Sequence, residues 1–191
     1  MVINIIKRKG VVSDEQVIAK TQKWVNEFIV DHNICPFARK ELDKGGVSFF
    51  VCAERDLAEA LHVLVELCQT LSEKTQIETA LLIFSEGFRD FDAYLDLLDL
   101  GNDLLAQQGY EGVFQLASFH PDYCFDGVDE KDASHFTNRS PFPMLHLLRE
   151  AGVEKALERY PDPAAIPERN IVYCQELGVE KLAGILTSCQ D

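Results

Sequence analysis

Apolar residues near the start of the chain recur at helical spacing. Between residues 17 and 29 they fall three or four positions apart, with charged residues on the other face. Ser13 and Asp14 precede this pattern as helix-capping residues. Pro36 disfavours helical geometry at the residue before it. The pattern therefore predicts a helix that begins after Ser13 and ends by Asn33.

Further along, helical patterns alternate with short apolar runs. The runs predict three strands, at residues 47–52, 79–84 and 113–119. Asp56 and Asp90 can each cap a helix between these strands. Strand, helix, strand, helix, strand is the order that builds a parallel sheet with right-handed crossovers. We therefore predict an α/β fold with a small, mostly parallel sheet of three strands, or four if residues 3–6 add one, covered by helices.

The composition changes in the last third of the chain, because six of the seven prolines lie between Pro121 and Pro167. Proline cannot donate to a strand ladder, so we expect no regular strand there. The segment instead predicts helices, at residues 141–151, 153–160, 168–177 and 179–188. Ser140 would cap the first of them, with Pro141 as its first helical residue. We expect this Pro-rich helical third to pack on the sheet within a single domain of residues 1–191.

The charge balance narrows the choice of partners. The chain of 191 residues has 32 Asp and Glu against 18 Lys and Arg, a net charge of -14, so we expect no nucleic-acid partner. No apolar run approaches the roughly eighteen residues of a membrane helix, and no secretory signal precedes the domain, so we expect a cytoplasmic protein without a membrane partner. No glycine-rich phosphate loop is present, and no cofactor is predicted. The sequence does not indicate an oligomeric state.

Polar residues gather just before the helix predicted at 141–151. Thr137, Asn138 and Ser140 offer hydroxyl and amide donors, and Arg139 offers a guanidinium that can hold a carboxylate or phosphate through two nitrogens. A helix N-terminus also attracts anions. We therefore predict that a small anionic molecule binds there. The alternative is that Ser140 only caps the helix and Arg139 pairs with a neighbouring acid.

His120 directly follows the third predicted strand and is the candidate acid/base residue. Open parallel sheets bind ligands at the carboxyl ends of their strands, and imidazole titrates near neutral pH. Tyr123 lies close by in the sequence and could orient the ring or bind substrate. By the same geometry Glu54, Ser85 and Glu86 would lie along that edge. The alternative is that His120 only binds the backbone of its loop.

Three further residues are candidates with weaker support. His146 and Arg149 are three positions apart, so they would share one face of the helix predicted at 141–151. That face either looks into the substrate site or lies at the surface, where His146 would bond Glu150. Cys35 is a candidate nucleophile if a cation or histidine lies near it, and otherwise a buried, inert thiol.

Two other classes of function stay open. His120, Cys124 and His135 lie close in sequence among several aspartates, which suggests a metal-dependent enzyme, although no recognised ligand spacing is present. The other class is a binding or regulatory module without chemistry. It would present the Pro-rich loop and the helix at 141–151 to a protein partner.

Five segments together carry a specific resemblance: the tryptophan-bearing first helix running into NICPFA, then ETALLIF, FHPDY, TNRSPFPMLHLLRE and YPDPAAIPERNI. Over about residues 24–178 the chain resembles the bacterial domain-of-unknown-function family 1415. The resemblance implies a bacterial protein but no particular activity. Because Cys35 stands within one of these motifs, we add it to His120 as a candidate catalytic residue. Our interpretation is an enzyme that acts on a small anionic substrate.

Overall fold

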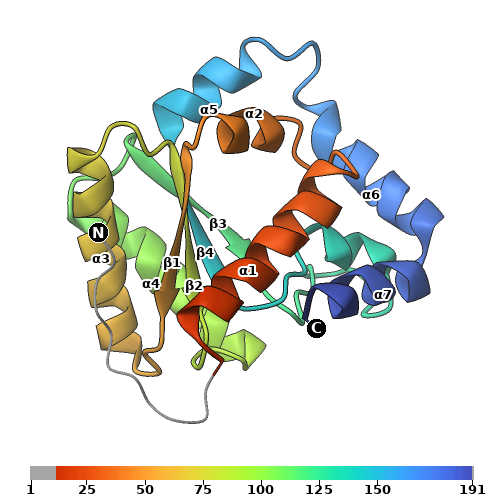
Figure 1. The fold of residues 1–191 in the computed structure, drawn as a ribbon, viewed down its shortest axis with the longest axis horizontal. Helices are drawn as coiled ribbons and strands as arrows, with labels where there is room; N and C mark the ends of the chain where they lie inside the picture. Colours follow the sequence, from red (N-terminus) through yellow and green to blue (C-terminus); the bar gives the residue numbers. More distant parts are fainter. Residues whose placement is uncertain (1–11, 191) are drawn as a thin grey trace.

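The computed structural model describes residues 12–190, in which four strands form one sheet with helices on both faces (Figure 1). The strands are β1 (Val47–Cys52), β2 (Thr79–Phe84), β3 (Phe114–Phe119) and β4 (Met144–Arg149). Their order across the sheet is β1-β2-β4-β3. β1 and β2 are parallel, whereas β4 is antiparallel to both of its neighbours. The α/β class is therefore confirmed, but the sheet is mixed. The strand expected at residues 3–6 lies outside the described residues.

The helices α3 (Leu57–Glu73) and α4 (Phe91–Gln107) cover one face of the sheet. Their predicted caps are present, because the Asp56 carboxylate accepts from two backbone N–H groups and that of Asp90 accepts from one. Leucines from both helices interlock with β2 and β4 in a fully buried layer. Burial of this apolar surface is the main force that holds the two helices on the sheet.

The opposite face is covered by elements from both ends of the chain. They are α1 (Asp14–Trp24), the π-helix η1 (Val25–Val30), α2 (Ala38–Asp43), the 3-10 helix η2 (Ala133–Thr137), α5 (Glu150–Leu157), α6 (Ala165–Leu177) and α7 (Val179–Gln190). The first predicted helix is confirmed, with a capping box at Ser13. Its last turns form the π-helix η1, in which Asp31 N–H donates to the carbonyl of Asn26, five residues earlier. None of the helices within the described range combines the length and the apolar character needed to span a membrane.

The prediction of a helix at 141–151 is wrong, because Met144–Arg149 is strand β4. The expectation that the Pro-rich third holds no strand is wrong for the same reason. β4 begins directly after Pro143 and contains no proline, so its ladder bonds are intact. It lies between β2 and β3 and is covered on both faces, so its apolar run lacks the alternation that marks a half-buried strand. A buried central strand also cannot offer the partner surface that the binding-module hypothesis placed there.

Candidate functional site

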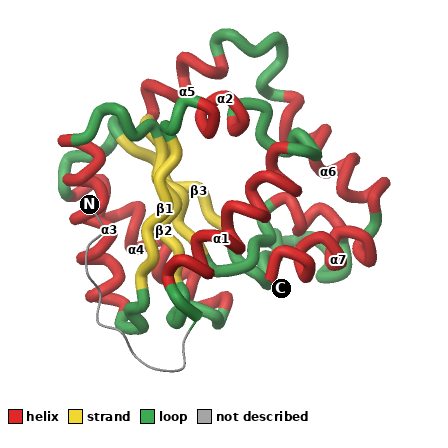
Figure 2. The backbone as a smooth tube through the Cα atoms, viewed as in Figure 1, coloured by secondary structure: helices red, strands yellow, loops and turns green. Residues whose placement is uncertain are grey.

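A cavity of about 550 Å³ opens on the sheet face opposite α3 and α4. Its floor consists of residues from all four strands, and most of its walls come from η1, α2, α5 and α6. Figure 2 shows these elements placed around one side of the sheet, with α2 and α5 above, α6 opposite the sheet and α1 below. A volume of this size lies within the range of roughly 300–1,000 Å³ that small-molecule sites occupy.

The cavity does not lie at the carboxyl edge of the parallel strands. Val47 and Thr79, the first residues of β1 and β2, both line it. At the edge that the sequence pattern favoured, the Glu86 carboxylate instead forms an ion pair with Arg55 at 2.8 Å. In this floor His146 and Leu148 of β4 stand beside Leu81 and Thr79 of β2.

His146 lies on the floor of the cavity, in the middle of β4. Its Nε2 is 2.5 Å from the hydroxyl oxygen of Thr79, which also donates to the carbonyl of Leu147 at 2.8 Å. The ring centroid of Phe119 is 6.1 Å away. Burial lowers the pKa of His146 to about 4, so the imidazole is neutral at physiological pH.

Cys35 lines the cavity from the loop between η1 and α2. Burial raises the pKa of its thiol, so the protonated form prevails near neutral pH. The loop turns at Asn33, whose φ is 53°, a left-handed conformation in which a non-glycine residue is uncommon. Arg169 donates to the carbonyl of Asn33, and Nδ2 of Asn170 donates to that of Ile34 at 2.7 Å. Helix α6 therefore positions the thiol through two side chains.

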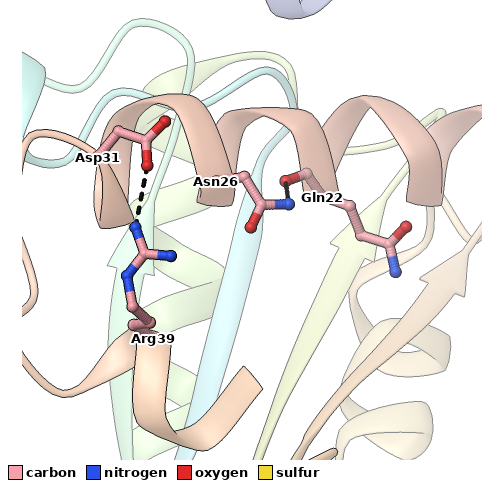
Figure 3. Close-up of polar contacts among 4 residues, drawn as sticks. All are labelled: Gln22, Asn26, Asp31 and Arg39. Atoms are coloured by element: carbon pink, nitrogen blue, oxygen red, sulfur yellow. Dashed lines mark hydrogen bonds and ion pairs between the residues drawn. The ribbon is translucent and has the colours of Figure 1, made fainter. Parts of the chain in front are cut away.

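An ion pair at the surface also holds the loop that carries Cys35. Arg39 on α2 donates to the carboxylate of Asp31 at 3.1 Å, just beyond the end of η1 (Figure 3). In the same view Nδ2 of Asn26 donates to the carbonyl of Gln22 at 2.9 Å, where the helix widens. The ion pair is mostly exposed, so its contribution to stability is small.

Thr137 and Asn138 line the cavity at the end of η2. The hydroxyl of Thr137 donates to the carbonyl of Ser134 at 2.8 Å and lies 3.1 Å from Oδ1 of Asn138. Nδ2 of Asn138 donates to the carbonyl of Ser118 on β3 at 3.0 Å. These bonds fix the loop against the sheet and engage most of the polar atoms of the two side chains.

Arg139 and Ser140 do not reach the large cavity. No helix begins at Pro141, so the expected helix N-terminus for an anion is absent, and the buried Ser140 hydroxyl donates to the carbonyl of Phe142 at 2.6 Å. Arg139 donates through Nε to the carbonyl of Tyr123 at 3.1 Å, and its guanidinium lies 4.7 Å from the ring centroid of Phe136. Both residues hold the loop between β3 and β4.

Tyr123 and His120 lie on the α4 side of the sheet. The Tyr123 hydroxyl is 3.2 Å from that of Ser118. His120 is fully buried, with its ring centroid 5.0 Å from that of Tyr94. Its Nδ1 accepts from the backbone N–H of Asp122 at 3.0 Å, so its Nε2 donates to the carbonyl of Phe88 at 3.0 Å. Neither ring nitrogen is free for a substrate. His120 is also separated from Cys35, which packs against the core on the other face of the sheet.

Arg149 closes the C-terminal end of α3. Its Nε donates to the carbonyl of Ile77 at 2.9 Å, and its Nη2 donates to the carbonyls of Leu71 and Lys74. These carbonyls follow or end a helix and have no partner within it. The structure thus places Arg149 away from the cavity, whereas His146, three residues earlier on the same strand, lies inside it.

The residues suggested for a metal do not gather. Cys124 Sγ lies 3.6 Å from Nε2 of His135, but this nitrogen also donates to the carbonyl of Asp129 at 2.8 Å, while Nδ1 accepts from the N–H of Phe125. Across residues 12–190 no group of three or more His, Cys, Asp and Glu side chains has the arrangement of a metal site.

Four of the predicted site residues therefore share one cavity: Cys35, Thr137, Asn138 and His146. Sequence reasoning missed Trp24, Thr79 and Asn170, which line it with them. Trp24 has the spacing of an ordinary core residue and Thr79 begins a buried strand, so neither carries a distinct signal. An asparagine within the apolar part of α6 was the one available hint, because a buried amide needs partners.

Neither the comparison with curated proteins nor the comparison with solved structures gives a match. One family model matches the chain, over residues 16–184, a range that includes every residue of the cavity lining. The chain therefore belongs to the family described as protein of unknown function (DUF1415).

Proposed function

We propose that this protein binds a small, largely apolar molecule in the cavity between the sheet, η1, α2, α5 and α6. The observation that carries the proposal is the cavity itself, about 550 Å³ with a predominantly apolar lining. Aromatic and aliphatic side chains such as Phe37, Leu81 and Ile166 supply most of that lining. Transfer of apolar ligand surface from water to such a lining is favourable, and a few polar groups then fix the orientation.

The charge of the lining favours a neutral ligand. Among its described residues the one with a full charge is Glu41, whose carboxylate is paired with Lys44 at 2.9 Å. No Lys or Arg of the described chain lines this cavity, so an anionic ligand would lose its hydration without gaining a counter-charge. The small anionic substrate inferred from the sequence stays a prediction, but its structural premise, a helix beginning at Pro141, is wrong.

Catalysis on the bound molecule is the second candidate function. A thiol at Cys35 and an imidazole at His146 line the same cavity, and these are the groups that nucleophilic thiol chemistry combines. The thiol is protonated at neutral pH, so such a reaction would require a base to remove its proton. This candidate replaces the pairing of Cys35 with His120, since these two residues lie on opposite faces of the sheet.

A titration with the neutral fluorophore N-phenyl-1-naphthylamine tests the binding function. The protein offers its own reporter, because Trp24 is the single tryptophan of the chain and lines the cavity. We expect saturable binding at one site, with an increase in fluorophore emission and a matching decrease in Trp24 emission. Unsaturable binding without any change at Trp24 would contradict the proposal.

A further inference from the structure

We propose that the ligand carries a hydrogen-bond donor, a hydroxyl or N–H group on an apolar body, and that this donor binds Nδ1 of His146. The inference rests on the proposed function and specifies the chemical class of the ligand. It assigns His146 a binding role as an acceptor at the floor of the cavity.

The hydrogen bonds of Thr79 determine which nitrogen of His146 carries the proton. A threonine hydroxyl has one hydrogen, and here it is directed to the carbonyl of Leu147 at 2.8 Å. The contact of 2.5 Å between the Thr79 oxygen and Nε2 of His146 therefore requires Nε2 to be the donor. In a neutral imidazole the other nitrogen, Nδ1, then has a free lone pair.

No group within residues 12–190 donates to that lone pair. Nδ1 of His146 forms no hydrogen bond with the described residues, and its surface is accessible. Because His146 lines the cavity, Nδ1 is open to its interior. The shift of its pKa to about 4 keeps the nitrogen unprotonated, and so an acceptor, throughout the physiological range.

The lining also holds a donor without a partner in the described part of the chain, the indole N–H of Trp24, but a donor cannot accept a hydrogen bond from the ligand. Oδ1 of Asn170 accepts from Arg169 at 2.6 Å, and Nδ2 of Asn138 donates to the carbonyl of Ser118 at 3.0 Å. The Cys35 sulfur faces the backbone N–H groups of the next turn. Nδ1 of His146 is thus an acceptor on the apolar floor without a donor of its own, and an unsatisfied acceptor in such surroundings is costly.

The surroundings of His146 restrict the rest of the ligand. In the sheet register it stands beside Leu81 on β2 and Ala117 on β3, and the Phe119 ring is its aromatic neighbour. A small alanine leaves room next to the imidazole, while the flanking groups are apolar. Phenols and indoles, which join a donor to a flat apolar ring, have this chemistry. A carboxylate has acceptors alone and would face the Nδ1 lone pair unfavourably.

A matched pair of probes tests the inference: 4-butylphenol and its methyl ether, which lacks the donor. Each would compete with N-phenyl-1-naphthylamine on the wild-type protein and on His146→Leu. We expect the phenol to bind the wild type about 3- to 10-fold more tightly than the ether, the effect of one neutral hydrogen bond. The His146→Leu variant should bind both with similar affinity.

A ¹⁵N NMR measurement keeps the test decisive if His146→Leu does not fold. The wild-type spectrum should show His146 protonated at Nε2, and addition of the phenol, but not of the ether, should shift the Nδ1 resonance. Equal affinities for the two probes, or protonation at Nδ1, would overturn the inference while the proposed function stands. If the fluorophore itself does not bind, the proposed function fails as well.

Discussion

The hydroxyl oxygen of Thr79 lies 2.5 Å from Nε2 of His146, a contact that joins β2 to β4 at the floor of the cavity. It holds the imidazole in one tautomer and one orientation. Since the imidazole is partly buried and neutral, its protonation is linked to folding.

The first prediction concerns the pH dependence of stability. The folded protein holds the pKa of His146 at about 4, below the usual 6.5, so the unfolded chain binds a proton first as the pH falls. Above about pH 7 the titration of this histidine does not change the free energy of unfolding. As the pH falls from about 6.5 to 4, it lowers the free energy of unfolding by roughly 1 kcal/mol per pH unit. Burial shifts the pKa of His120 in the same direction.

Urea unfolding at several pH values above the carboxylate range measures this dependence. His146→Leu should lose stability less steeply on acidification than the wild type. The control is His62→Gln, which removes an exposed histidine on α3 and should alter the slope less, because solvent screens its exposed pair with Glu66. Parallel curves for His146→Leu and the wild type would refute the linkage.

The second prediction concerns the loop that carries Cys35. Asn170→Ala removes the bond of 2.7 Å to the carbonyl of Ile34 and leaves that buried acceptor unpaired. We expect a loss of about 1–3 kcal/mol in the free energy of unfolding. Asn102→Ala is the matched control, because this amide also donates to a backbone carbonyl but is exposed on α4. Equal effects of the two substitutions in chemical denaturation would argue against a positioning role for Asn170.

The third prediction separates stability from binding at His120. His120→Leu leaves the carbonyl of Phe88 and the N–H of Asp122 without their partner, so we expect a loss of about 1–3 kcal/mol. Affinity for N-phenyl-1-naphthylamine should stay within about twofold of the wild type. A variant of normal stability that no longer binds the fluorophore would instead indicate that His120 belongs to the binding site.

The fourth prediction concerns the reactivity of Cys35. Because burial raises its pKa, alkylation by iodoacetamide should be slow near neutral pH and should accelerate as the pH rises. A bound apolar ligand should protect this thiol. Mass spectrometry of the peptide that contains Cys35 gives the rate, and Cys124, which does not line the cavity, is the internal control. Alkylation at the same rate with and without ligand would place Cys35 outside the ligand's reach.

Much of the first two thirds of the fold could be predicted from the sequence, because local signals are strong there. Asp56 and Asp90 cap their helices as expected, and β2 is a continuous apolar run buried on both faces. β4 could not be recognised, since a buried central strand and a short buried helix have the same apolar composition. That one error also moved the expected anion site, which depended on a helix starting at Pro141.

The candidate site was predicted in part, for a related reason. Cys35, Thr137, Asn138 and His146 meet in the cavity, although the helical face assigned to His146 does not exist. His120 sits where parallel sheets often bind ligands, yet one ring nitrogen binds the N–H of Asp122 in its own loop and the other binds the carbonyl of Phe88 in a distant loop. The contact with Phe88 arises from tertiary structure, and residue spacing does not report it.

A cavity-filling substitution tests the central claim, that the cavity binds an apolar ligand, most directly. Ala117 lies on the floor beside His146, so Ala117→Phe would place a ring inside the cavity. Ala106→Phe, at an exposed position of α4, adds the same ring elsewhere. We predict that Ala117→Phe weakens N-phenyl-1-naphthylamine binding at least tenfold, about 1.4 kcal/mol, while Ala106→Phe binds like the wild type. Unchanged binding by a folded Ala117→Phe variant would contradict the account.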